Sequence, residues 1–418
     1  MNEAPVVTCF LRNEDAVLLL RRSGEGGLHG RWDGVSRPVA TADPEQDARR
    51  AIDDATGLGD AAALVRRGEP FPVEDDDLGT RWIVHPFLFD CDRRPVRVGR
   101  GPAEAAWVPP PEILRRETVP QLWAAYRSAG PSLESICADR SHGSAWLSFR
   151  VLEVLRDRAA EEGLGDDVAA WSRLCALADG LRTARPPMAA LANRVNRAMY
   201  RAREEASAEA VGRAAQATLR DAIDAEGAVA RRAAAFVSGR RVFTLSRSGT
   251  VLAALRLADP PPGRLVIAAS EPGGEGRALA ETLAKQGVPV TLVADAAVAQ
   301  VFEQEQADVV LVGADAVLRS GHVVNKVGTL TAASWARHHH VPCYAAAATD
   351  KIRTDDAAPL GEADPAALYD GDAPLDRFNP LFEVTPARYF SGLITEEGIL
   401  AAADVQDVAF ELKTMADW

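Results

Sequence analysis

The stretch at residues 309–334 constrains this chain most, because a buried strand is followed directly by charged residues. Residues 309–312 form a continuous apolar run, which is typical of a strand buried on both faces. Asp315 follows it, and ligands of open α/β sheets bind just beyond the carboxyl ends of strands. Asn325 and Lys326 precede an expected helix N-terminus, which attracts anions. We therefore expect a phosphorylated small molecule here; the alternative is a structural turn capped by Asp and Asn.

Apolar runs and helical segments alternate from residue 241 onward, which predicts a doubly wound parallel sheet. Between residues 132 and 237 the chain is rich in alanine and expected to be helical, interrupted only by Pro186 and Pro187 and by a break near residue 225. We therefore expect a helical subdomain at 132–237 and a Rossmann-like α/β domain at 238–418. The five apolar runs of the sheet are 242–245, 265–270, 288–294, 309–312 and 343–348.

A separate domain is expected at residues 1–128, ahead of a linker of mostly small residues at 127–131. A helix is expected at 44–56, because Pro44 suits a first helical turn and Gly57 suits a helix C-terminus. Its sheet is expected to contain strands at 6–11, 16–21, 81–90 and 106–109.

The amino-acid composition argues against nucleic acid and membrane as binding partners. The net charge of −13 argues against broad binding of nucleic-acid phosphates. No run of eighteen apolar residues is present, so no membrane span is expected. Five scattered cysteines indicate a reducing cytoplasm rather than a disulfide framework. Arginine supplies nearly all the positive charge, and the four lysines are Lys285, Lys326, Lys351 and Lys413.

The motif GADAVLRSGHVVNKVGT at 313–329 resembles the signature of the alpha, beta and delta subunits of translation initiation factor 2B. The same superfamily contains ribose-1,5-bisphosphate isomerase and methylthioribose-1-phosphate isomerase. Further similar motifs are HGS at 142–144, RPPMAAL at 185–191 and NPLFEVTP at 379–386, so the resemblance covers nearly all of 139–400. It implies a helical subdomain followed by a Rossmann-like sheet, and association into at least a dimer.

The resemblance implies that Asp315 works with the residue at position 246, which is a cysteine in the isomerases and Ser246 here. A hydroxyl is a much weaker acid than a thiol, and the alternative role for Ser246 is to cap a helix. An arginine of the family is replaced by Glu271, which we expect to disfavour a second phosphate. The other expected ligand-binding residues are His142, Gly143, Ser144, Arg185, Arg247, Ser248, Gly273, Gly274, Asn325 and Lys326.

These substitutions favour a regulatory protein that binds a sugar phosphate or nucleotide, with a translation initiation factor as an expected partner. One enzymatic alternative is an aldose–ketose sugar-phosphate isomerase that uses Asp315 and Ser246. No cofactor is required by either hypothesis. A second enzymatic alternative comes from the first 128 residues.

The layout of residues 1–128 resembles a Nudix domain, which implies an α/β/α fold and hydrolysis of nucleoside diphosphate derivatives with Mg²⁺. Arg50 matches the catalytic box of that family, but Ala51 and Ala55 replace two of its glutamates. Asp54 is the one carboxylate that stands at a glutamate position of the box. Mg²⁺ prefers several oxygen ligands in octahedral geometry. We therefore expect at most weak metal binding by Asp54, and a domain that does not hydrolyse its ligand.

Overall fold

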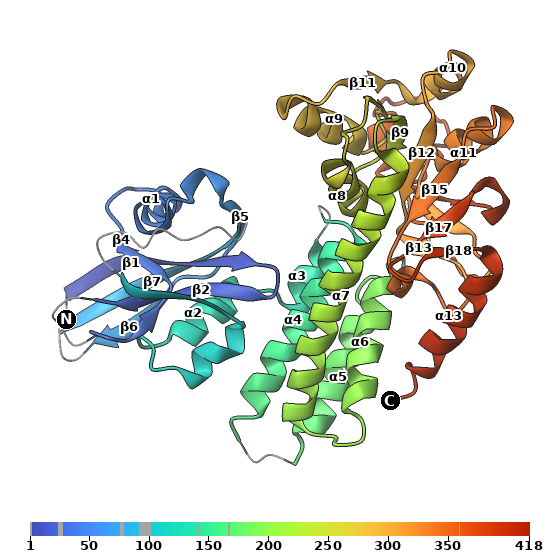
Figure 1. The fold of residues 1–418 in the computed structure, drawn as a ribbon. Helices are drawn as coiled ribbons and strands as arrows, with labels where there is room; N and C mark the ends of the chain where they lie inside the picture. The colour runs from blue at the N-terminus through green and yellow to red at the C-terminus, as the bar shows by residue number, and fades with distance from the viewer. Residues whose placement is uncertain are drawn as a thin grey trace. The chain divides into compact units, whose positions relative to one another are not determined.

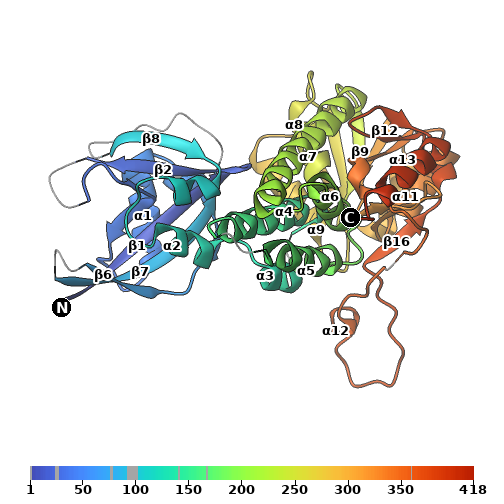
Figure 2. The same ribbon diagram turned by 90° about the horizontal axis from the view of Figure 1, so that it is seen from below.

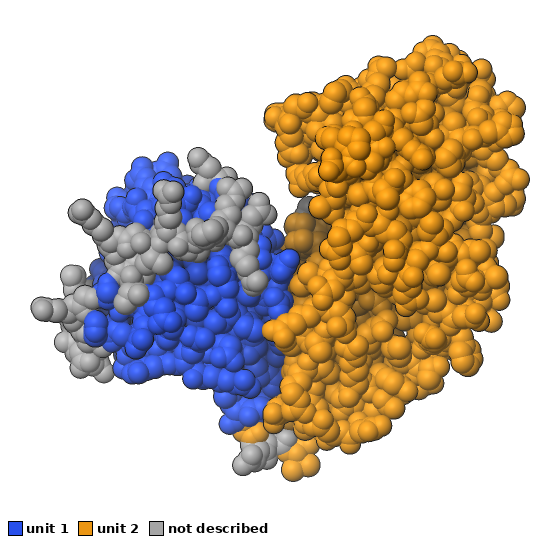
Figure 3. All heavy atoms as spheres, viewed as in Figure 1, with its two compact units in different colours: residues 1–132, 156–164 blue, residues 133–155, 165–418 orange. Residues whose placement is uncertain are grey.

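The computed structural model describes residues 2–23, 28–75, 79–91, 102–139, 142–165, 168–358 and 360–418. The chain divides into two compact units (Figure 3). The first contains residues 1–132 and 156–164, and the second contains residues 133–155 and 165–418. No helix within the described ranges is long and apolar enough to cross a membrane.

The first unit is built on a mixed sheet with a helix against one face (Figure 1). Its centre is the parallel pair of β1 and β7, and the remaining pairings are antiparallel. Helix α1 (Pro44–Thr56) begins after Asp43, whose side chain accepts from the Glu45 N–H, and ends at Gly57 in a left-handed conformation, as predicted. The strands are β1 (Asn2–Asn13), β2 (Ala16–Arg22), β3 (Trp32–Asp33), β4 (Val35–Pro38), β5 (Ala63–Arg67), β6 (Phe71–Asp75), β7 (Thr80–Asp90) and β8 (Pro102–Val108).

Residues 156–164 belong to the first unit, although the sequence assigned them to the helical subdomain. They form the end of α4 (Ser144–Glu162) and pack beside α2 (Leu122–Ala129). The Tyr126 hydroxyl donates to Asp157 at 3.1 Å. Arg127 donates to Glu161 at 2.9 Å. Contacts between residues about thirty positions apart cannot be predicted from local sequence patterns.

The helical part of the second unit is centred on α7 (Ala208–Val237), a single helix of 30 residues. The predicted break near residue 225 was wrong, because alanines on both sides of Gly227 offset the modest helix cost of one glycine. The interruption at Pro186 and Pro187 is confirmed, since it separates α5 from α6. The other helices are α3 (Leu133–Ala138), the first part of α4, α5 (Ala170–Thr183) and α6 (Ala189–Ala202).

The predicted parallel sheet is confirmed, with seven strands in the order β11-β10-β9-β12-β15-β17-β18. All neighbours are parallel except the edge pair β17 and β18. From β9 the chain adds β10 and β11 on one side, and then returns to add β12 on the other. The strand order therefore reverses between β9 and β12, where ligands of such sheets bind. The bounds are β9 (Arg241–Leu245), β10 (Arg264–Ala268), β11 (Val290–Val293), β12 (Val309–Gly313), β15 (Cys343–Ala346), β17 (Gly392–Ile394) and β18 (Ile399–Leu400).

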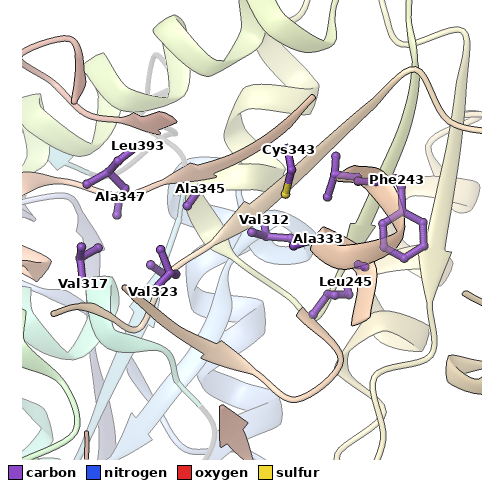
Figure 4. Packing of buried hydrophobic residues seen from close by; sticks show 14 of the residues in the cluster. Phe243, Leu245, Val312, Val317, Val323, Ala333, Cys343, Ala345, Ala347 and Leu393 are labelled. Carbon is purple, nitrogen blue, oxygen red and sulfur yellow. The ribbon is translucent and has the colours of Figure 1, made fainter. Parts of the chain in front are cut away.

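Both faces of this sheet are buried, because alternate residues of each strand enter different cores. On one face, Phe243 and Val312 pack with Ala333 from α11 (Thr329–His338), as Figure 4 shows. On the opposite face, Leu311 packs with Val229 from α7. The sheet is thereby held between helices, with the carboxyl ends of its central strands left for the site.

A small antiparallel sheet lies after β12 and contains β13 (Ala316–Val317), β14 (Val323–Lys326) and β16 (Phe382–Thr385). Between β14 and β16 the chain also forms a long projecting loop that carries α12 (Pro365–Leu368) (Figure 2). Exposed apolar side chains on this loop are Leu368, Leu375 and Phe378. The remaining helices of the second unit are α8 (Gly249–Leu257), α9 (Glu275–Lys285), α10 (Val298–Glu303) and α13 (Ala402–Thr414).

Candidate active site

The hairpin of β13 and β14 brings Asn325 and Lys326 back beside Asp315. Ala316 pairs with Val324, and the Asp315 N–H donates to the Val324 carbonyl at 2.9 Å. Asp315 is therefore held by the backbone at the point where the strand order reverses. The structure brings these three residues together, although Asn325 and Lys326 lie ten and eleven positions after Asp315 in the sequence.

Two buried lysines lie near the Asp315 carboxylate. Lys351 ends η4 (Thr349–Lys351) and donates to the Ala314 carbonyl at 3.0 Å, and Lys326 pairs with Glu275 at 2.9 Å. Burial raises the pKa of Asp315, the charges of Lys351 and Lys326 oppose this rise, and Glu275 adds to it. None of the described residues forms a hydrogen bond with the partly exposed Asp315 carboxylate. The carboxylate is thus left for a ligand, with a pKa displaced towards that of a useful base.

Below Lys351 lies a buried ionic network that joins the helices to the sheet. Arg194 of α6 is fully buried, donates to Asp350 at 3.1 Å and pairs with Glu226 of α7 at 3.3 Å. Arg197 also donates to Asp350, at 2.7 Å. Burial alone would raise the pKa values of Asp350 and Glu226. The two arginines nevertheless lower the pKa of Asp350, and Lys351 together with Arg194 lowers the pKa of Glu226. Local sequence patterns do not indicate this network, although the rarity of lysine in the chain distinguishes Lys351.

Ser246 and Ser270 follow β9 and β10, and both have positive φ, 62° and 65°. Non-glycine residues seldom adopt this conformation, and it is often found at functional sites. The Ser246 N–H donates to the Ser270 hydroxyl at 2.7 Å. The helix cap expected at Ser246 is instead Ser248, whose hydroxyl accepts from Val251 at the start of α8. The partly exposed Ser246 hydroxyl has no hydrogen-bond partner among the residues that the structure describes.

The glycine turn before α9 is shaped by close contacts rather than left open. A Cβ at Gly276 would lie 1.8 Å from the Ala268 carbonyl oxygen, so glycine is required there. The Gly274 N–H already donates to the Ser270 carbonyl, and the carboxylate of Glu275 lies over Gly273. Gly273 and Gly274 were predicted to bind phosphate. The Gly274 N–H is therefore already bonded within the chain, and the space beside Gly273 is already filled by Glu275.

Two charged side chains, Glu271 and Arg247, lie on the turns near the site, and Glu271 is paired. Glu271, expected to repel a second phosphate, forms an ion pair with Arg277 on α9. Arg247 is exposed at the turn after β9. A substrate phosphate that approaches this edge would meet a neutralised carboxylate rather than an isolated negative charge.

The N-terminus of α11, expected to attract an anion, is already occupied. Glu383 of β16 accepts from the N–H groups of Gly328 and Leu330 at 2.7 and 2.8 Å. Asn325 is buried and donates to the Thr329 hydroxyl at 3.0 Å. A phosphate could reach this helix end only by displacing Glu383.

The residues of the HGS motif lie at the start of α4. His142 stacks on Trp146, with ring centroids 3.8 Å apart, and its Nδ1 lies 2.7 Å from Asp139. Arg185 hydrogen-bonds the carbonyl of Asp139. Gly143 has open space where a Cβ would be, and Ser144 is buried. One turn further on, the Ser148 hydroxyl accepts from Arg194, which connects α4 to the buried network.

The metal site implied by the resemblance of the first unit does not fit the residues present. The Asp54 carboxylate is paired with Arg37 at 2.5 Å, so its negative charge is already compensated. Ala51 and Ala55 supply no oxygen, and Arg50 adds positive charge nearby. No group of three acidic, histidine or cysteine side chains suited to a metal occurs within the described ranges. A single paired carboxylate does not make a Mg²⁺ site.

Residues 140–402 match the Initiation factor 2 subunit family. Methylthioribose-1-phosphate isomerase from Bacillus pumilus is 37% identical over 194 residues, which make up 41% of this chain and 55% of that protein. Methylthioribose-1-phosphate isomerase from Ricinus communis is 30% identical over 258 residues, or 53% of this chain and 67% of that protein. The chain thus spans little more than half the length of the first of these relatives.

Solved structures give the same architecture. Translation initiation factor eIF-2B from Pyrococcus horikoshii OT3 superimposes with a TM-score of 0.57 and 28% identity, covering 66% of this chain and 97% of that one. 5-methylthioribose 1-phosphate isomerase from the same organism gives a TM-score of 0.55 at 21% identity, covering 68% of this chain and 86% of that one. The second likeness concerns the fold alone. These matches confirm the predicted resemblance over residues 140–402.

The comparisons overturn the expectation of a regulatory ligand-binding protein, because the curated relatives bear the name of an enzyme. The regulatory hypothesis rested on Ser246 and Glu271, which replace a cysteine and an arginine of the family. Glu271 is neutralised by Arg277, and Asp315 with its two lysines is in place. The substitutions therefore change the site without removing the Asp315 carboxylate.

We predict that Arg194→Met lowers the free energy of unfolding by about 3–5 kcal/mol, because it leaves buried carboxylates at Asp350 and Glu226 with fewer partners. Arg201→Met on the same helix is the control, since Arg201 pairs with Asp221 in partly exposed surroundings. Its expected cost is about 0–1 kcal/mol. Urea unfolding monitored by circular dichroism measures both. Equal losses in the two variants would contradict a stabilising role for the network.

Proposed function

The chain belongs to the Initiation factor 2 subunit family, and from this premise we propose that it is an aldose–ketose isomerase acting on a sugar phosphate. The observation that carries the proposal is the Asp315 carboxylate, which is free of hydrogen bonds from the described residues and lies near two buried lysines. The names of the curated relatives support the same class of reaction.

The proposed reaction moves a proton between two neighbouring carbons and needs no co-reactant. Asp315 takes the proton from carbon 2 of the sugar ring and returns it to carbon 1, while the bond between carbon 1 and the ring oxygen breaks and carbon 2 becomes the carbonyl carbon. The proton lost by the hydroxyl at carbon 2 is transferred to the ring oxygen, and the phosphate stays on carbon 1. Ser246 stands at the end of the neighbouring strand β9 and would hydrogen-bond these oxygens during the transfer.

Burial suits Asp315 to this role. A carboxylate with a raised pKa is a stronger base, and general acid–base catalysis works best when the pKa lies near the operating pH. The positive charges of Lys351 and Lys326 oppose the rise in the pKa of Asp315. We propose that the substrate phosphate binds on the Lys326 side and displaces Glu275 from its ion pair.

The activity test uses methylthioribose 1-phosphate and ribose 1,5-bisphosphate with the full-length chain. We expect turnover of a sugar phosphate, and Asp315→Asn should lower kcat by about 10²- to 10⁴-fold, because the base is lost. Ser246→Cys should increase kcat, since a thiol is the stronger acid. Asp355→Asn, at an exposed ion pair, is the control and should retain wild-type rates. Wild-type activity in Asp315→Asn, or no turnover of either substrate, would contradict the proposal.

The pH dependence of kcat/KM tests the electrostatics of the same site. The base must be ionised, so activity should fall as the pH drops through the raised pKa of Asp315. Lys351 favours the carboxylate, so Lys351→Met should raise this pKa further and move the acid limb to higher pH. Lys326 and Glu275 also face Asp315 and remain unchanged in this variant. The control is Lys285→Met, which removes an exposed lysine paired with Glu281. An acid limb that stays in place, or moves to lower pH, would show that Lys351 does not act on Asp315.

We also propose that the chain forms at least a dimer through the projecting loop between η4 and β16, which carries α12. Phe378 is 79% exposed there, and Leu368 and Leu375 are exposed beside it in the sequence. Light scattering at micromolar concentration should give at least twice the mass of one chain, and Phe378→Ser should lower it. Phe410→Ser removes a similarly exposed phenylalanine from α13 and should leave the mass unchanged. A monomeric wild type would contradict the proposal. A translation initiation factor as partner stays a prediction.

A further inference from the structure

Glu275, the first residue of α9, forms an ion pair at the edge of the proposed isomerase site. Its Oε1 accepts from the Lys326 ammonium group at 2.9 Å. The Lys326 side chain is 3% exposed, whereas the Glu275 side chain is 39% exposed. The lysine is therefore fixed in the interior, and the carboxylate is the partner that has a path into solvent.

Few contacts hold the Glu275 carboxylate on Lys326. Its second oxygen, Oε2, is buried and has no hydrogen-bond partner among the residues that the structure describes. A buried oxygen without a donor loses the hydrogen bonds that water would give it. If the side chain turned outward, both of its oxygens would be hydrated, and this gain would offset part of the lost ion pair. A ligand can therefore displace this carboxylate at modest cost.

The position of the Glu275 carboxylate also depends on Gly273, because the carboxylate lies over this glycine. A Cβ at Gly273 would overlap the carboxylate group. The backbone of Gly273 lies outside the left-handed region, so an alanine is compatible with its conformation. Glycine thus leaves room for the ion pair, and an alanine would push the flexible end of Glu275 aside.

Other groups on this edge that attract anions are also paired within the chain. Glu383 occupies two N–H groups at the start of α11, and Arg277 pairs with Glu271. A singly charged ligand at Lys326 would only replace one anion by another. Glu275 is tethered beside this lysine, and a tethered group competes at an effective concentration on the order of millimolar. A single negative charge therefore brings little net gain in binding.

A phosphate monoester differs from other anionic groups in its charge. It carries about −1.5 to −2 charges at pH 7, together with three oxygens that accept hydrogen bonds. A carboxylate, a sulfate ester or a phosphodiester group carries a single negative charge. Exchanging Glu275 for a phosphate monoester thus increases the negative charge on Lys326, and hydrogen bonds between ionised groups are the stronger ones.

We propose that Glu275 competes with the ligand for Lys326 and thereby makes the site selective for a terminal phosphate monoester over singly charged groups. The location of the ligand at Lys326 rests on the proposed isomerase function. The inference goes further, because it excludes sugar acids and phosphodiesters as substrates. It also assigns this selectivity to one side chain.

The test is isothermal titration of the full-length chain with methyl phosphate and methyl sulfate, which are similar in shape and differ in charge. The wild type should bind methyl phosphate more tightly than methyl sulfate. Glu275→Gln should bind methyl sulfate about 10- to 100-fold more tightly than the wild type does, because the charge-assisted hydrogen bond of Lys326 becomes available. Gly273→Ala should shift affinity in the same direction without a change of charge.

The matched control is Glu281→Gln, which removes a carboxylate paired with the exposed Lys285 on the same helix. This variant should bind both ions as the wild type does. Adding Lys326→Met to Glu275→Gln should abolish the gained affinity for methyl sulfate, since the lysine is the binding group.

Three results would overturn the proposal. They are equal affinity of the wild type for the two ions, unchanged affinity for methyl sulfate in both Glu275→Gln and Gly273→Ala, and a gain that survives Lys326→Met. Sugar-phosphate turnover together with any of these results would reject Glu275 as the competitor and leave the isomerase function standing. The expected ion binding without turnover would support the selectivity and reject the isomerase function.

Discussion

The contact between Lys351 and the carbonyl of Ala314 is the interaction on which the site of the second unit depends. It fixes a buried positive charge directly under the turn that carries Asp315. A lysine in such surroundings needs negative partners nearby, because desolvating a charge is costly. Glu226 supplies one, and Arg194 with Asp350 connects it to α6. The charge beside Asp315 is thus set by residues from two helices and two strand ends together.

Local backbone strain at the strand ends is the second constraint. Ser246 and Ser270 both have positive φ, and a hydrogen bond from one to the other holds them. Asp295 accepts from the N–H groups of Ser270 and Glu271 and so fixes the second turn. Because Gly276 lets α9 approach β10 closely, that helix can bring Glu275 within reach of Lys326. Strain and close packing here therefore serve to place side chains around one small space.

Much of the second unit could be predicted from sequence, because its signals are local. A buried apolar run followed by Asp315 predicted the strand and the position of the carboxylate, and a motif of seventeen residues predicted the neighbouring Lys326. Glu383 could not be predicted as the partner of the α11 N-terminus, since it lies more than fifty residues further along the chain. The partners of Arg194 in the buried network are distant for the same reason. The sequence also placed the helix cap at Ser246, two residues before the actual cap, because either serine fits the pattern.

In the first unit, carboxylates of α1 are balanced by contacts within the chain. Carboxylates that lie close together repel one another, and alanines at positions 51 and 55 leave fewer of them around Asp54. Arg37 balances it, and Asp47 is satisfied by the N–H groups of Ala40 and Thr41. Asp33 is paired with Arg22 on a different part of the sheet, so its orientation owes nothing to a metal. The charges of Asp33 and Asp54 are therefore balanced by two different arginines, Arg22 and Arg37.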